Sequence, residues 1–107
     1  MCIRDRRRFV HESGEYAELE TGATTLAFAS RELAASNLPP AVRPAQVGAP
    51  TPAFEVCFVT EDVRAAFERA VEGGAQPVSE PQTKPWGQDV AYVRDRDGNL
   101  IELASPI

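Results

Sequence analysis

Two glutamates stand in alternating segments where apolar residues surround them. Glu55 belongs to the segment 54–59 and shares one face of it with Cys57. Glu102 occupies a similar position in the segment 100–104. A carboxyl group among apolar side chains has a raised pKa unless it is paired, which is a property of proton-transfer groups, metal ligands and cation receptors. The alternative is that both acids lie on a solvated sheet face.

Three further side chains are of types that take part in chemistry. Trp86, the only tryptophan, lies between Pro85 and Gly87 and therefore on a loop, where it can stack on a ligand, cover a core edge or anchor a dimer interface. Cys57 is interpreted as a small packing residue, because no histidine or helix N-terminus precedes it to lower its pKa. His11, the only histidine, is expected to be an exposed strand residue.

The second half of the chain predicts the elements that must position these side chains. A strand at 54–59 is followed by Thr60, the expected N-cap of a helix whose apolar residues recur over 63–71. Gly73 and Gly74 end this helix. Three more strands are expected, at 76–79, 88–94 and 100–104, with a turn at 96–99 before the last one.

The first half of the chain predicts strands only. The contrast with the second half divides the chain into four predicted regions. Three strands separated by turn signals are expected at 8–11, 16–20 and 24–29. The predicted regions are 1–6 for a non-native or disordered start, 7–30 for a partial first unit of three strands, 31–51 for a proline-rich linker and 52–107 for a complete second unit. This pattern predicts an internal repeat whose first copy lacks its opening strand and helix.

Length, charge and cysteine content narrow the class of protein. The chain has 107 residues, of which 43% are hydrophobic and 25% charged, so it has room for one core. The net charge of −5 repels phosphate backbones, so no nucleic-acid partner is expected. No membrane partner is expected either, because no apolar run approaches the roughly 20 residues of a membrane helix. Two cysteines without disulfide or zinc spacing favour a reducing, cytoplasmic location.

Three stretches together resemble the vicinal oxygen chelate superfamily, whose members include glyoxalase I, extradiol dioxygenases, fosfomycin-resistance enzymes and bleomycin-resistance proteins. They are the strand-to-helix sequence 58–63, the helix exit 73–75, and the sequence 92–103 with its D-x-D-G-N-x-I-E-L ending. The resemblance implies an α+β fold of paired βαβββ modules curled around a cavity. In this chain the first module would lack its opening strand and helix.

The resemblance also implies where a divalent metal binds in the family's enzymes. Glu102 matches a family ligand, Glu55 stands where glyoxalase-like members carry histidine, and Ala27 replaces an acidic ligand. Because a catalytic metal usually has three protein ligands, no cofactor is expected; one divalent metal ion held by Glu102 and Glu55 is the alternative. The sequence 85–87 resembles the P-W-G stretch of bleomycin-resistance proteins, which bind a flat cationic drug without a metal.

The expected function is therefore binding of a small molecule in a sheet-lined cavity, as in an antibiotic-resistance protein of the bleomycin type. The candidate ligand-binding residues are Trp86, Glu55, Glu102, Cys57 and Tyr92, and no catalytic residue is assigned. The alternative is a metal-dependent glyoxalase or lyase, or a dioxygenase-like enzyme, that uses Glu102. A folded remnant without activity is a third reading, so whether the protein is an enzyme stays open.

A homodimer is expected from the first half of the chain. Its strands have no helix of their own to cover Leu19, Leu26 and Phe28, and they leave a free edge where an opening strand would lie. A second copy would cover both the apolar face and the edge.

Overall fold

The structure of the chain is a computed structural model that describes residues 6–20, 23–40, 42 and 54–107. The chain divides into two compact units, Met1–Leu38 and Pro39–Ile107. The predicted start at 1–6 lies outside the described residues except for Arg6, which already belongs to a strand. Residues 41 and 43–51 of the predicted linker lie outside them as well.

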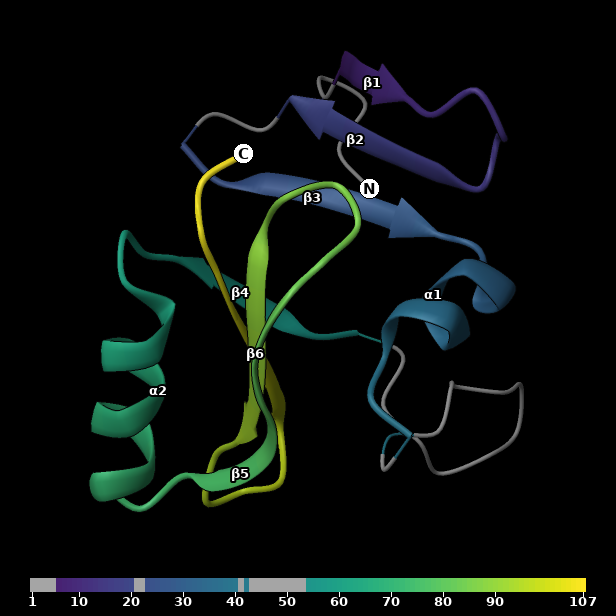
Figure 1. The fold of residues 1–107 in the computed structure, drawn as a ribbon. Helices are drawn as coiled ribbons and strands as arrows, with labels where there is room; N and C mark the ends of the chain where they lie inside the picture. The colour runs from purple at the N-terminus through teal and green to yellow at the C-terminus, as the bar shows by residue number, and fades with distance from the viewer. Residues whose placement is uncertain (1–5, 21–22, 41, 43–53) are drawn as a thin grey trace. The chain divides into compact units, whose positions relative to one another are not determined.

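The first unit is a three-stranded antiparallel sheet followed by a short helix (Figure 1). Its strands are β1 (Arg6–Val10), β2 (Tyr16–Glu20) and β3 (Thr25–Ala29), in the order β1-β2-β3, as the sequence predicts. Helix α1 (Arg31–Asn37) begins at Ser30, whose Oγ accepts a hydrogen bond from the backbone N–H of Leu33. The first seven residues of the segment predicted as a linker are therefore helical and belong to this unit.

The second unit has the predicted order of strand, helix and three strands. Its elements are β4 (Val56–Val59), α2 (Val63–Glu72), β5 (Gln76–Thr83), β6 (Asp89–Arg94) and β7 (Leu100–Ala104). The strand order is β4-β7-β6-β5; β4 runs parallel to β7 and the other neighbours are antiparallel. Neither described helix is long and apolar enough to cross a membrane.

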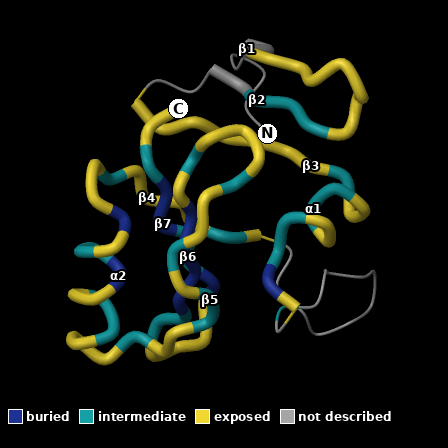
Figure 2. The backbone as a smooth tube through the Cα atoms, in the orientation of Figure 1, coloured by how far each residue is buried: buried dark blue, intermediate teal, exposed yellow. Residues whose placement is uncertain are grey.

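Helix α2 covers one face of this sheet and forms the core with it (Figure 2). Val63 and Phe67, one helical turn apart, pack on Ala91 and Val93 of β6 and on Leu103 of β7. All five side chains are buried. Since β-strand side chains alternate between faces, the residues between these strand positions lie on the other face of the sheet.

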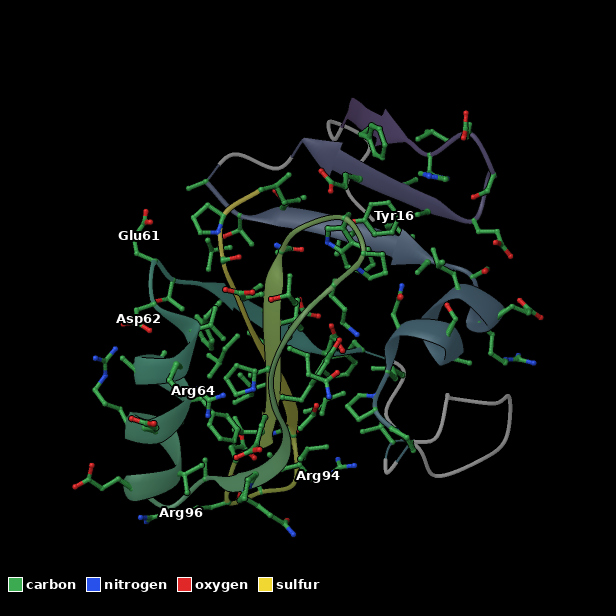
Figure 3. The ribbon with its side chains drawn as sticks, viewed as in Figure 1. Tyr16, Glu61, Asp62, Arg64, Arg94 and Arg96 are labelled. Carbon is green, nitrogen blue, oxygen red and sulfur yellow. The ribbon has the colours of Figure 1, made fainter. Side chains whose placement is uncertain are left out.

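The two ends of α2 are fixed by different contacts. Asp62, not the predicted Thr60, is the N-cap: its Oδ1 accepts from the backbone N–H of Ala65 at 3.0 Å, because the helix begins only at Val63. At the other end Arg96, from the turn before β7, donates to the carbonyl of Gly73 at 3.2 Å. Figure 3 labels Asp62 and Arg96 near these two ends.

The sheet of each unit contains an antiparallel hairpin. In the first unit the pairs run from Tyr16↔Ala29 to Glu20↔Thr25, and in the second from Val90↔Ala104 to Arg94↔Leu100. Counted from the pair next to each turn, Ala27 corresponds to Glu102, which is the correspondence that the resemblance in sequence implies.

The packing of α2 predicts a large difference between two phenylalanines. Replacing the buried Phe67, whose side chain is 6% exposed, with alanine leaves a cavity and should lower the free energy of unfolding by about 3–5 kcal/mol. Phe54→Ala, at a side chain 75% exposed, should lower it by less than about 1 kcal/mol. Urea denaturation followed by the emission of Trp86, which lies in the same unit, measures both. Equal effects would show that α2 does not form the core.

Candidate functional site

Glu102 is the centre of a hydrogen-bonded group on the sheet face opposite α2. Its Oε1 accepts from the phenol of Tyr92 at 3.0 Å, and its Oε2 accepts from the thiol of Cys57 at 3.3 Å. These partners come from the strands on either side of β7, where Tyr92 and Cys57 are the direct cross-strand neighbours of Glu102. The strand pairing alone therefore brings the three side chains together.

Glu55 completes the group from the residue that precedes β4. Burial, a hydrogen bond to Glu102 and the negative charge of Glu102 raise the pKa of Glu55 from 4.5 to about 8. Glu55 is therefore protonated at neutral pH and donates to the Glu102 carboxylate. The two carboxyl groups hold one negative charge between them.

The other two members of the group are also protonated donors. Burial is the largest cause that raises the pKa of the Cys57 thiol to about 12, followed by the charge of Glu102. The same causes raise the pKa of the Tyr92 phenol. Cys57 is not part of the core that α2 forms with the sheet, contrary to its interpretation as a packing residue, because it lies on the other face and its thiol donates to Glu102. Its raised pKa also makes it a poor nucleophile.

The residues around Glu102 do not fit a catalytic metal. Both carboxylate oxygens of Glu102 already accept hydrogen bonds from neutral donors. The protonated Glu55 contributes no negative charge that would attract a metal ion. Ala27, at the corresponding position of the first unit, has no donor atom. Within the described part of the chain, no group of three or more His, Cys, Asp or Glu side chains is arranged to hold a metal ion.

Trp86 lies apart from this group, on the turn between β5 and β6. Its indole N–H donates to the Gln88 amide oxygen at 2.8 Å, and the Gln88 amide donates to the carbonyl of Ser105 at 2.7 Å. These two bonds tie the turn to the residues that follow β7. The indole is 53% exposed, and among the described residues no ring contact is recorded for it. The structure therefore gives Trp86 an open face but does not place it beside Glu102.

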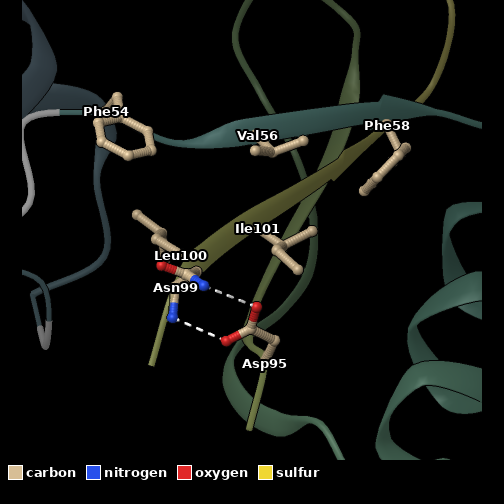
Figure 4. Close-up of a pocket in the computed structure, with 7 residues that line it drawn as sticks. All are labelled: Phe54, Val56, Phe58, Asp95, Asn99, Leu100 and Ile101. Carbon is tan, nitrogen blue, oxygen red and sulfur yellow. Dashed lines mark hydrogen bonds between the residues drawn. The ribbon is translucent and has the colours of Figure 1, made fainter. Parts of the chain in front are cut away.

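A shallow groove lies along β4, mainly on the sheet face that carries α2 (Figure 4). Its apolar lining is Phe54, Val56, Phe58, Leu100 and Ile101. The groove ends at the turn before β7, where the Asp95 carboxylate accepts from the side-chain and backbone N–H groups of Asn99. These bonds, the side-chain one first, lower the pKa of Asp95. The groove is thus a different surface from the one that Glu102 occupies.

Two contributions were missed by reasoning from the sequence. Gln88 holds the indole of Trp86, and nothing in its sequence context indicates this contact. The Tyr92–Glu102 hydrogen bond could have been found, because the turn at 95–99 fixes which residues of the hairpin stand opposite each other. Of the five predicted binding residues, the structure brings four together and leaves Trp86 outside that group.

Glu55 makes the stability of the second unit depend on pH. Between its unfolded pKa of 4.5 and its folded pKa of about 8 the folded chain holds a proton that the unfolded chain releases. The free energy of unfolding should therefore fall as the pH rises through this range. Glu55→Gln should flatten the profile of the thermal midpoint and raise the midpoint at about pH 8. Glu61→Gln, at an exposed position, is the control; a Glu55→Gln profile as steep as the parent's would contradict the assignment.

A family model matches the chain. The model of the Glyoxalase/Bleomycin resistance protein/Dioxygenase superfamily matches residues 4–103. Similar solved structures include TioX from Micromonospora sp. ML1, at 25% identity and a TM-score of 0.48, covering 96% of this chain and 80% of that one. A glyoxalase-related enzyme from Fulvimarina pelagi is 20% identical, with a TM-score of 0.49 and coverage of 95% and 70%. No curated protein matches the chain.

The family assignment rests on the extent of the family match. The match covers residues 4–103 and so extends from before β1 into β7, the last strand of the second unit. The order of strand, helix and three strands in that unit is the one that the resemblance in sequence implies. The chain therefore belongs to the glyoxalase/bleomycin resistance protein/dioxygenase superfamily.

Proposed function

We propose that the chain binds a small organic molecule in a cavity lined by the sheet face of Glu102, without a metal ion. This is the mode of a bleomycin-resistance-type binding protein, which protects by holding its ligand. The ligand class is an aromatic or amphipathic molecule with a cationic or hydrogen-bond-donating group. Glu55, Cys57, Tyr92 and Glu102 would bind that group, and Trp86 would stack on the aromatic part.

One observation supports this proposal above the others: the Glu102 carboxylate is surrounded by neutral donors. Tyr92 and Cys57 each donate a hydrogen bond to one of its oxygens, and the protonated Glu55 donates to it as well. An approaching ammonium or amidinium group can take the place of that proton, because it offers both a positive charge and N–H donors. That proton is released to the solvent, so the carboxyl pair carries two negative charges while it binds the cation.

The metal-dependent enzyme is less well supported. A Lewis-acid role needs an ion with an open coordination position, held by about three protein ligands. Glu102 is the only position that matches the family ligands among those in the described residues, since Ala27 has no donor atom and Glu55 is protonated. The chemistry of these residues therefore favours binding over metal-assisted catalysis.

Metal content separates the two functions. Protein purified without chelators should contain less than one transition metal per chain, and titration with Mn²⁺ should give no saturable heat, because the carboxyl pair carries a single charge. Elemental analysis and calorimetry measure these quantities. One metal per chain that is lost in Glu102→Gln but kept in Glu61→Gln would contradict the proposal.

Trp86 should report ligand binding. A flat aromatic cation such as proflavine should quench its emission if the ring stacks on the indole, and Trp86→Ala should weaken binding of the dye by about 1–3 kcal/mol. Trp86→Phe, which keeps an aromatic face, is the matched control and should retain most of the affinity measured by dye absorbance. An equal affinity in parent and Trp86→Ala would show that Trp86 has no binding role.

A further inference from the structure

The indole of Trp86 is held by a series of two hydrogen bonds that passes through Gln88. The indole N–H donates to the amide oxygen of Gln88 at 2.8 Å, and the amide nitrogen of Gln88 donates to the carbonyl of Ser105 at 2.7 Å. Rotating this amide by half a turn would place two donors against each other at the indole and two acceptors against each other at Ser105. The Gln88 amide is therefore held in one orientation, and it holds the indole N–H in turn.

Ser105 is a firm anchor for this amide, because it is bonded to the residue that follows Gln88. The backbone N–H of Ser105 donates to the carbonyl of Asp89 at 2.9 Å. The side-chain oxygen of Ser105 accepts from the backbone N–H of Asp89 at 2.9 Å. These bonds continue the pairing of β6 with β7 by one residue, beyond the pair Val90↔Ala104. The carbonyl that accepts from Gln88 is thus held by the sheet.

The backbone that carries Trp86 is held by the turn between β5 and β6. The N–H of Gly87 donates to the carbonyl of Lys84, and the N–H of Lys84 donates to the carbonyl of Gln88, each at 2.8 Å. Pro85 has a restricted φ, and Gly87 has a φ of +94°, which favours glycine. The backbone and the ring N–H of Trp86 are therefore both held, although about half of the side chain is exposed.

We propose that Gln88 is a positioning residue for ligand binding, which orients the open face of the Trp86 indole before a ligand arrives. This inference rests on the proposed function, in which Trp86 stacks on the aromatic part of the ligand. An exposed side chain that turns freely must become ordered when it binds a ligand, and this ordering weakens the affinity. The two hydrogen bonds of Gln88 order the ring in the free chain, so the ligand does not have to.

The same bond determines what Trp86 can recognise. The N–H is the only hydrogen-bonding group of a tryptophan side chain, and here it is bonded to Gln88. A ligand at this position therefore meets the face of the ring and no free donor. A ring face binds flat aromatic groups by stacking and cations by its negative quadrupole. Gln88 thus makes Trp86 selective for flat or cationic groups over groups that need a hydrogen-bond donor.

The position of the ring can be tested without a ligand, because the only tryptophan gives a single indole N–H signal in a ¹H–¹⁵N NMR spectrum. Gln88→Met keeps a side chain of similar length but removes both hydrogen bonds. It should speed the exchange of the indole N–H with water by at least about fivefold. Gln82→Met, at an exposed position of the same hairpin, is the control. The amide signals of Phe67 and Leu103 in the core should stay unchanged in both variants. An indole N–H that exchanges equally in parent and Gln88→Met would overturn the proposal.

A second variant of Gln88 separates its two hydrogen bonds. Gln88→Glu keeps an acceptor for the indole N–H but cannot donate to the carbonyl of Ser105. Exchange of the indole N–H should therefore be faster than in the parent and slower than in Gln88→Met. Exchange as slow as in the parent would overturn the anchoring role of Ser105.

A double-mutant cycle connects the position of the ring to the affinity for a ligand. Gln88→Met should weaken the binding of proflavine by about threefold in the parent, because the indole must then be ordered on binding. In a Trp86→Phe background it should change the affinity by less than about 1.5-fold, since the phenyl ring has no N–H for Gln88 to hold. Absorbance of the dye measures both effects.

The outcomes of this cycle separate the two proposals. Equal weakening in both backgrounds, or no weakening in a parent that binds the dye, would overturn the role of Gln88 and leave the proposed function standing. A parent chain that binds no proflavine would contradict the proposed function, and with it the role of Gln88 in ligand binding.

Discussion

The pairing of β7 with a strand on each side is the constraint on which the candidate site depends. β7 is antiparallel to β6 and parallel to β4, so Glu102 has one direct cross-strand neighbour from each. Those neighbours are the phenol of Tyr92 and the thiol of Cys57, and each bonds one carboxylate oxygen. A shift of either strand by one residue would turn its donor to the other face of the sheet. The site is therefore a property of strand register more than of any loop.

This arrangement also explains why a carboxylate persists on a largely apolar sheet. Even for a half-buried carboxylate such as Glu102, the partial loss of water is costly unless hydrogen bonds or an opposite charge compensate for it. Here the compensation comes from neutral donors and from a second carboxyl group that keeps its proton. Because these donors are all neutral, none of them forms an ion pair with Glu102.

The sequence predicted those parts of the fold that depend on local pattern. The alternation in 54–59, the helical apolar repeat that ends at Gly73 and the turn before β7 all correspond to elements of the structure. It was less accurate where two nearby residues can each cap a helix. At the N-terminus of α2, Asp62 and not Thr60 accepts the hydrogen bond from Ala65. The contact of Cys57 with Glu102 joins residues 45 positions apart, and no local pattern reports on a contact of that range.

That separation along the chain also bears on the order in which the second unit assembles. β6 and β7 are joined by a tight turn that the Asp95 carboxylate closes, so their pairing requires little loss of chain entropy. β4 also lies beside β7, although α2, β5 and β6 come between these two strands in the sequence. Contacts of long sequence separation are the slow ones to form, and strands at the edge of a sheet are among the first to open. We therefore expect the thiol of Cys57 to reach Glu102 late in folding, after the β6–β7 hairpin has formed.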